Sequence, residues 1–261
     1  MKRIFVFLML FIGTAAVAHT INWYVDGNIF HTTTCESGED ITPPTAPEKY
    51  GYTFKEWKSY TPIEYLESTG NTATYINTGI KPNYRTTKIE VDAVLELATG
   101  KYDTAGVLFG LRQYPTYTIG IRDVGTNNEQ YFQFGSERYF KQDTGFLYGS
   151  RHVFVLSKNG FSIDDTFFSY SREYDFEQST YDIYMFACND DYQSTINNPK
   201  PRSYTPAKIY YFKIYDNDIL VRDFIPVLDY NKIPCMYDKV ENKFYYNQGT
   251  GDFIAGPIIS E

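Results

Sequence analysis

Short runs in which apolar and polar residues alternate recur along most of the chain, separated by turn residues. A period of two predicts β-strands, and eight or more at this spacing indicate an antiparallel sandwich. In the first long run, Ile89, Val91, Ala93 and Leu95 are expected to face the core, and Glu90, Asp92 and Glu96 the solvent. The expected strands are 88–95, 106–111, 116–121, 130–134, 151–156, 160–163, 181–187 and 208–215.

The pattern breaks in one long stretch, residues 189–206, which is rich in Asn, Asp, Ser and Pro. Irregular segments of this length inside a domain are usually functional or disordered. We therefore expect a binding site there first.

A smaller unit precedes the sandwich. Residues 20–25 and 29–35 read as two strands joined by an Asp26-Gly27 turn, which predicts a hairpin. Prolines between 43 and 47 prevent further sheet pairing, and residues 51–57 then resume a strand. The sequence thus predicts a small module over residues 19–60 and a larger domain over residues 61–258.

The first 18 residues are typical of a secretory signal peptide. Lys2 and Arg3 precede an apolar run, residues 4–12, and small residues up to Ala18 mark a cleavage site before His19. The apolar run is shorter than the roughly 20 residues that a membrane span needs. We expect a secreted or cell-surface protein with no membrane span in its mature chain.

Composition and charge fit this interpretation. The chain is 43% hydrophobic and 18% aromatic, with 26 Tyr, and aromatic residues favour pleated, half-buried surfaces. Loss of the signal peptide would leave 22 basic residues against 32 acidic ones. That balance opposes phosphate neutralisation, so nucleic acid is not an expected partner.

The most specific segments lie at the two ends of the larger domain. They are Pro62–Gly70 and Tyr75–Ile80 at one end, and Asp223–Val227, Pro234–Asp238 and Lys243–Gly251 at the other. With them, residues 62–257 resemble laminin-G-like, concanavalin-type jelly-roll modules of bacterial secreted and surface proteins. Residues 20–59 resemble the internalin-type β-grasp repeat, with Glu56 where that repeat has glycine.

The resemblance implies an all-β protein, with an antiparallel jelly-roll sandwich after a small β-grasp-like module. It also implies a non-catalytic binding or adhesion protein that recognises carbohydrate or a host or cell-surface protein. Fold alone does not decide function, because lectins, adhesins and hydrolases share this architecture.

Candidate ligand-binding residues are tyrosines in or near expected loops, whose rings could stack on a sugar face. We name Tyr114, Tyr117 and Tyr192 first, with Tyr139 and Tyr148 as further candidates. With 26 tyrosines in the chain, a structural role is the competing interpretation for each of them.

Asn189, Asp190 and Asp191 offer the hard oxygen ligands that calcium prefers, and they form the one weak calcium candidate. Calcium takes six to eight oxygens, so a solvated acidic loop is the competing interpretation. No other cofactor is expected.

The chain has three cysteines, so at least one is unpaired within a monomer. A Cys188–Cys235 disulfide is one hypothesis, because both residues fall in the larger domain. Three isolated buried thiols, with Cys35 as the third, are the alternative.

Two further functional hypotheses remain open. One is a structural subunit of a bacterial surface assembly that self-associates through strand edges or a free cysteine. The other is a glycoside hydrolase that uses Glu90 and Glu96. Retaining enzymes need two carboxyl groups roughly 5–5.5 Å apart, whereas these two glutamates would lie about 20 Å apart along a regular strand.

Overall fold

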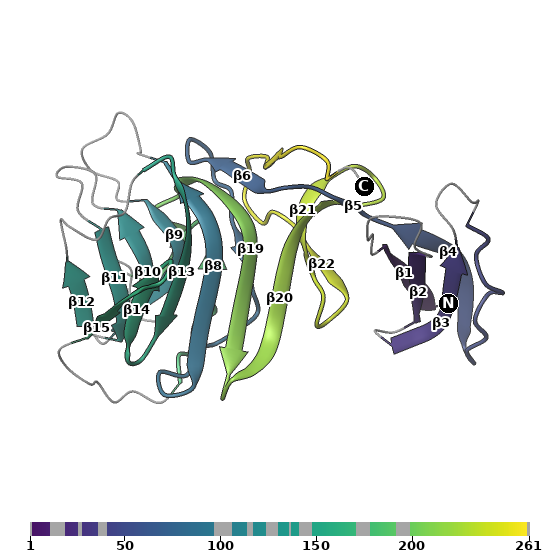
Figure 1. Ribbon diagram of the computed structural model, residues 1–261, viewed down its shortest axis with the longest axis horizontal. Helices are drawn as coiled ribbons and strands as arrows, with labels where there is room; N and C mark the ends of the chain where they lie inside the picture. The colour runs from purple at the N-terminus through teal and green to yellow at the C-terminus, as the bar shows by residue number, and fades with distance from the viewer. Residues whose placement is uncertain are drawn as a thin grey trace.

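In the computed structural model, all regular secondary structure of the described residues is β, arranged in three sheets (Figure 1). This confirms the expected all-β class and its mainly antiparallel sheets. The described residues are 2–10, 19–25, 28–35, 41–96, 106–113, 117–123, 130–135, 137–140, 148–170, 178–191 and 199–259.

The smallest sheet lies at the N-terminus, with strand order β3-β2-β1-β4. Its members are β1 (Lys2–Leu10), β2 (His19–Val25), β3 (Asn28–Cys35) and β4 (Tyr52–Ser59). Strands β2 and β3 pair antiparallel, as the hairpin predicted. Strand β1 lies between β2 and β4, antiparallel to the first and parallel to the second. Residues expected in the signal peptide therefore form an inner strand of this sheet.

The apolar side of the small sheet is built around its two tryptophans. Trp23 is 2% exposed, and its ring meets that of Trp57 edge to face at a centroid distance of 4.9 Å. In the register of β1, Leu8 lies opposite Trp23 and Val6 opposite Trp57. Strand β1 thus joins the two strands that carry the tryptophans. Ala18, on the other side of the predicted cleavage site from His19, lies outside the described residues.

Two larger sheets form the rest of the protein. The eight-stranded sheet has the main order β12-β11-β10-β9-β16-β7, with β17 and β18 attached beside β9. Its strands are β7 (Ile76–Asn77), β9 (Val107–Gln113), β10 (Tyr117–Asp123), β11 (Gln130–Gly135), β12 (Glu137–Phe140), β16 (Tyr184–Met185), β17 (Cys188–Asp190) and β18 (Lys200–Arg202).

The eleven-stranded sheet has the main order β15-β14-β13-β8-β19-β20-β21-β22, with the short β5, β6 and β23 at its side. Its strands are β5 (Thr61–Pro62), β6 (Leu66–Thr69), β8 (Thr87–Leu95), β13 (Arg151–Ser157), β14 (Gly160–Ile163), β15 (Thr166–Ser169), β19 (Pro206–Asp216), β20 (Ile219–Leu228), β21 (Pro234–Asp238), β22 (Lys243–Tyr245) and β23 (Ile254–Ala255).

The core lies between these two sheets. On β8, Ile89, Val91, Ala93 and Leu95 are all 0% exposed and belong to it, as the alternation predicted. Asp92 was expected to face the solvent but is only 5% exposed, because Arg151 of β13 covers it and donates to both of its carboxylate oxygens. Aromatic pairs join the layers: Phe109 of β9 meets Phe212 of β19 at 5.2 Å, and Phe132 of β11 stacks on Phe161 of β14 at 4.1 Å. Aromatic pairs of this kind add about 0.5–1.5 kcal/mol beyond the burial of their area.

The two ends of the larger domain meet, as the sequence indicated. Strand β5 pairs with β20, β6 pairs with β23, and Ile63 forms an isolated bridge with Ile258. Tyr60, which precedes β5, packs on Tyr237 of β21 at 4.6 Å. Figure 1 shows the small sheet to one side of the sandwich, connected to it through β5.

One expectation about secondary structure was wrong. Residues 189–206 were expected to be irregular, and 181–187 to be a strand. In the structure only Tyr184–Met185 pair within the second range, whereas β17 and β18 pair with each other inside the first. Tertiary contacts explain this difference. Strand β17 also pairs parallel with β9, and a strand of three residues is too short to show a period-two pattern in the sequence.

Candidate functional site

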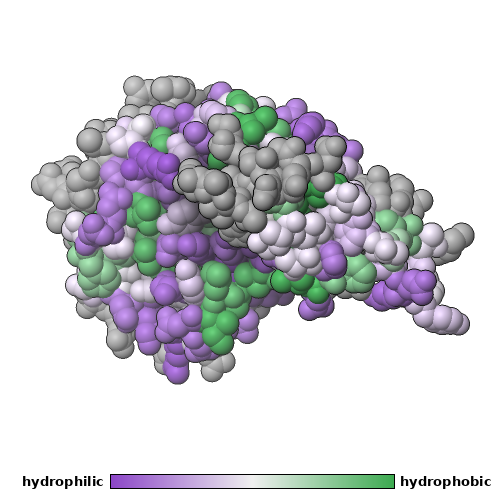
Figure 2. Space-filling model, turned by 45° about the vertical axis from the view of Figure 1, so that its right-hand side comes forward, coloured by the Kyte–Doolittle hydropathy of each residue, from purple (hydrophilic) through white to green (hydrophobic). Residues whose placement is uncertain are grey.

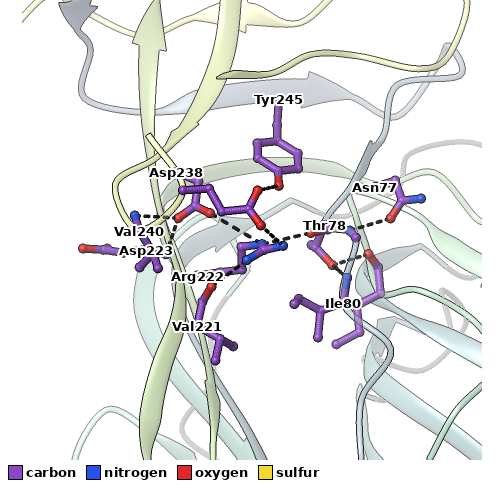
Figure 3. A network of polar contacts seen from close by, with 12 residues as sticks. Asn77, Thr78, Ile80, Val221, Arg222, Asp223, Asp238, Val240 and Tyr245 are labelled. Atoms are coloured by element: carbon purple, nitrogen blue, oxygen red, sulfur yellow. Dashed lines mark hydrogen bonds and ion pairs between the residues drawn. The ribbon is translucent and has the colours of Figure 1, made fainter. Parts of the chain in front are cut away.

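The segments that carried the resemblance converge on one side chain, Arg222 of β20 (Figure 3). Its Nε donates to the carbonyl of Thr78 at 3.2 Å, and its Nη1 donates to the carbonyl of Val221 at 2.8 Å. Its Nη2 lies 2.6 Å from the carboxylate of Glu241, in the turn between β21 and β22. The guanidinium is 12% exposed, so these contacts fix it in place.

A buried carboxylate lies behind Arg222. Asp238 is 0% exposed, and its Oδ1 accepts backbone N–H bonds from Asp223 at 2.9 Å and Val240 at 3.1 Å. Its Oδ2 lies 3.5 Å from Arg222 Nε. Burial raises the pKa of Asp238 above its ordinary value, although the two N–H groups and Arg222 act in the opposite direction. Arg222 therefore offsets the cost of ionising this carboxyl.

Glu241 and Tyr245 complete the polar network around Arg222. The Tyr245 hydroxyl donates to Glu241 Oε2 at 2.5 Å, so both Glu241 oxygens are engaged. Burial, together with this hydrogen bond, raises the pKa of Tyr245. Lys243 lies with its Nζ 4.9 Å from the centre of the Tyr245 ring, within the range of a cation–π contact.

Two Asx turns lie beside this polar network. In one, the Asn77 side chain accepts the Gly79 N–H at 2.8 Å; in the other, the Asn247 side chain accepts the Gly249 N–H at 2.9 Å. Asn side chains favour such turns because they can mimic a backbone acceptor. Asn247 also accepts the N–H of Tyr75 at 3.0 Å, which holds the second turn against the strand leading to the first.

Between the turns lies an open cavity of about 410 Å³, within the usual size range of small-molecule sites. Its aromatic and carboxamide lining consists of Phe244, Tyr245, Tyr246, Asn77, Asn247 and Gln248. Its charged lining consists of Arg222, Glu241 and Lys243. We call this cavity the Arg222 cavity.

The composition of the Arg222 cavity determines its chemistry. Aromatic rings offer flat apolar faces, and carboxamides offer both donors and acceptors. Among its described lining residues Glu241 is the one carboxylate, whereas glycoside hydrolysis uses two. The arrangement is suited to binding a polar ligand.

No protein-family model, curated protein or solved structure matches this chain. Function is therefore inferred from this chain's own residues. The described part of the chain also forms no helix long and apolar enough to span a bilayer.

Of the predicted tyrosine sites, Tyr148 alone has a described side chain, and it does not line the Arg222 cavity. Tyr114 and Tyr192 lie outside the described residues. Tyr117 begins β10 and Tyr139 lies in β12, but their side chains are also outside them. Tyr148 is half-buried and packs against the main core, which is a structural role.

The calcium candidate does not converge on one point. Asn189 donates to the carbonyl of Asp182 at 3.0 Å, Asp190 lies 3.5 Å from Arg112, and Asp191 accepts the Tyr181 hydroxyl at 2.8 Å. All three residues are buried rather than in a solvated loop. Within the described ranges, no three His, Cys, Asp or Glu side chains are grouped so that they could hold a metal ion.

The Cys188–Cys235 disulfide is not formed, and all three cysteines are free thiols. Cys188 is on β17 of the eight-stranded sheet and Cys235 on β21 of the eleven-stranded sheet. Burial raises the pKa of Cys188 to about 12. Both thiols therefore have the character of buried structural cysteines.

Glu90 and Glu96 have different surroundings. Glu90 lies on the outer face of β8 with Lys213 Nζ at 3.4 Å, and Glu96 follows the end of that strand. The pairing of β8 with β13 is regular from Ile89 to Val94, and the irregularity opposite β8 lies on β19. Residues six apart on such a strand remain about 20 Å apart, too far for a retaining pair.

Sequence reasoning missed Arg222 and Glu241, which line the cavity, and Asp238, which lies behind Arg222. One available signal was the Arg222-Asp223 pair of charged residues within the otherwise apolar strand 219–228. A second was the repeated Asn-x-Gly pattern at residues 77–79 and 247–249, inside the two segments that carried the resemblance. Together these signals indicate two turns and a positive charge, that of Arg222, which needs a carboxylate partner.

Proposed function

We propose that this chain is a secreted or cell-surface, non-catalytic binding protein, in which a laminin-G-like jelly roll over residues 61–258 binds carbohydrate in the Arg222 cavity. The N-terminal module is proposed to be β-grasp-like and to present this domain. The Arg222 cavity carries the proposal, since it combines aromatic faces, carboxamides and fixed charges in one open site.

Pre-organisation supports carbohydrate as the ligand class. Sugars present many hydroxyl groups, and fixed donors and acceptors bind them with less ordering cost than mobile ones. Asn77 and Asn247 are held by Asx turns, and Tyr246 donates its hydroxyl to Asp229 at 3.0 Å. Tyr246 as a residue is 37% exposed, so part of its surface is available to a ligand.

The test is a glycan-array screen of the purified protein, run with calcium and again with EDTA. Titration calorimetry follows with the best glycan and two variants. Lys243→Ala/Gln248→Ala removes two exposed lining side chains, and Lys158→Ala removes an exposed lysine from the turn between β13 and β14.

Binding that weakens by about tenfold or more in the first variant, equivalent to about 1.4 kcal/mol, and not in the second is the expected result. Equal affinities in all three proteins would refute the Arg222 cavity as the site. No binding to any glycan would refute carbohydrate as the ligand. Loss of binding in EDTA would contradict a metal-independent site.

Self-association is a second candidate function, favoured by one observation. Strand β3 is an edge of the N-terminal sheet and exposes Ile29 at 57% and Phe30 at 45%. Exposed apolar edge strands tend to pair with other chains. Light scattering would show concentration-dependent oligomers that Ile29→Lys dissolves, and a monomer at every concentration would exclude this route.

A further inference from the structure

A second open cavity, of about 650 Å³, lies beside the Arg222 cavity, and Gly79 lines both. We call it the Asp216 cavity. Its polar and charged lining consists of Lys81, Asn83, Thr86, Thr87, Gln178, Asp182, Asp216 and Asn217. It is therefore rich in hydroxyl, carboxamide and carboxylate groups, and it lacks the aromatic residues of its neighbour among the described lining residues.

The boundary between the cavities is thin. Asn77 lines the Arg222 cavity and Asp182 the Asp216 cavity, and the Asn77 Nδ2 donates to Asp182 at 2.9 Å. Val221 and Arg222 are consecutive on β20, and each lines one of the two cavities. A single pair of side chains and one strand thus separate them.

Gly79 lies on this boundary, because it lines both cavities. Its φ of +70° lies in the left-handed region, where a glycine is favoured. A Cβ at this position would lie 3.8 Å from Arg222 Nη2, so the space above the turn is open enough for a ligand to approach the backbone.

The turn that carries Gly79 is rigidly held. Thr78 donates its N–H and its hydroxyl to the carbonyl of Ile183, at 3.1 Å and 2.8 Å. The Thr78 hydroxyl also accepts the Ile80 N–H at 3.2 Å, and the carbonyl of Thr78 accepts Arg222 Nε. Figure 3 shows this turn facing the Arg222 network. Both cavities therefore keep a fixed relative position.

The charges of the two cavities favour a neutral ligand. In the Arg222 cavity the guanidinium is already matched by Glu241 and by Asp238 behind it, and the other cation of the described lining, Lys243, lies over the Tyr245 ring. In the Asp216 cavity, Asp182 and Asp216 outnumber Lys81. Carboxylates accept hydrogen bonds from hydroxyl groups, and they repel anionic substituents.

From these observations we infer that the two cavities form one groove, which binds adjacent units of a neutral oligosaccharide with its chain crossing above Gly79. This inference rests on the proposed function, since it extends the same site. The expected ligand is therefore a sugar chain long enough to fill both cavities, rather than a monosaccharide. Neutral glycans are expected to be preferred over acidic ones.

The experiment measures affinity against chain length. Cello-, laminari-, manno- and malto-oligosaccharides, from the monosaccharide to the hexasaccharide, are titrated calorimetrically against the purified protein. The variant Lys81→Ala/Gln178→Ala truncates two exposed side chains of the Asp216 cavity, and Lys158→Ala is the matched control. Oligogalacturonates of the same lengths supply the acidic comparison.

In at least one neutral series, affinity is expected to rise roughly tenfold or more with length and then level off, once both cavities are filled. Lys81→Ala/Gln178→Ala should lower the affinity for long chains several-fold and leave that for the shortest binding chain unchanged. Lys158→Ala should change neither affinity.

A flat dependence on length, with Lys243→Ala/Gln248→Ala still weakening the short chain, would overturn the groove and leave the proposed function standing. Tighter binding of oligogalacturonate would overturn the neutral class. Failure of every series to bind would overturn the inference as well, and the glycan array would then decide the proposed function separately.

Discussion

Removal of Arg222 should leave the buried carboxyl of Asp238 beside an apolar side chain. Arg222→Met keeps most of the side-chain length and removes the charge. The guanidinium is 12% exposed and Asp238 is 0% exposed, with Arg222 Nε 3.5 Å from Asp238 Oδ2. At an effective dielectric constant of about 20, such a pair attracts by about 4–5 kcal/mol. Removal also relieves the arginine's own desolvation, so a net loss of about 3 kcal/mol in unfolding free energy is expected.

The loss should depend on the charge of Asp238. Asp238→Asn retains a carbonyl oxygen that can accept the two backbone N–H bonds and removes the negative charge. In that background Arg222→Met loses only its contacts with Thr78, Val221 and Glu241, which are worth about 1 kcal/mol. The double-mutant cycle should therefore give a coupling of about 2 kcal/mol between the two positions.

The pH dependence has a definite sign. The pKa of Asp238 is raised on folding, so this group's contribution to stability is greatest when it is protonated and decreases as pH rises from the ordinary value of 3.8 through the folded value. Without Arg222 the folded pKa of Asp238 rises further. Arg222→Met should therefore cost more at about pH 7 than at about pH 4.

Urea unfolding followed by the near-ultraviolet circular dichroism of the tyrosines measures all four proteins of the cycle. A cost of Arg222→Met that is the same with and without Asp238→Asn would refute the reasoning. So would a cost that grows as the pH falls.

Three further predictions concern other parts of the molecule. Phe161→Ala removes a ring stacked between two other phenylalanines, and it should cost about 3–5 kcal/mol in urea unfolding; a cost below about 1 kcal/mol would contradict the described core. In the native protein a thiol reagent should modify Cys35 alone, because Cys188 and Cys235 are buried, and all three should react in denaturant; a native count of two or more would contradict their burial. The pKa of Asp164 is lowered, mainly by its hydrogen bond to a histidine, so its stabilising effect is present above the ordinary value of 3.8 and is lost as pH falls through the folded value; Asp164→Asn should flatten the acid limb of a plot of urea midpoint against pH, and an unchanged limb would refute this.

The fold was predictable wherever one face of a strand is buried. On β8, inward Ile89, Val91, Ala93 and Leu95 alternate with outward residues, and a period of two is a local property that the sequence displays directly. The ends of β8 and β19 moved by only one or two residues from those expected. Strands β17 and β18 escaped prediction because tertiary pairing decides their structure. Strand β17 pairs with β9, which is distant in the sequence, and β18 pairs with β17.

The candidate site was less predictable because it is assembled from distant parts of the chain. Arg222 and Thr78 are 144 residues apart, and Asn247 and Tyr75 are 172 apart. Local patterns cannot bring such residues together, although the two Asn-x-Gly turns were visible. The tyrosines chosen for exposed loops were selected by residue type alone, and type does not specify neighbours.

The surface gives a similar lesson about hydrophobicity. On the face shown in Figure 2, hydrophobic residues (green) lie among hydrophilic ones (purple) rather than in one broad patch. Single exposed apolar residues are normal on a soluble surface and carry no information about a partner. Polar networks such as that of Arg222 are therefore the more informative feature of this protein.

The placement of the two tryptophans divides the protein spectroscopically. Trp23 and Trp57 are the chain's only tryptophans, and both belong to the small N-terminal sheet, whereas the sandwich contains none. Indole emission therefore reports the state of the small sheet, and the many tyrosines report chiefly that of the sandwich. Because Val6 and Leu8 of β1 pair in register with Trp57 and Trp23, the emission of the full chain and that of a chain beginning at His19 should differ. The protein thus carries an intrinsic optical reporter for the presence of its first strand.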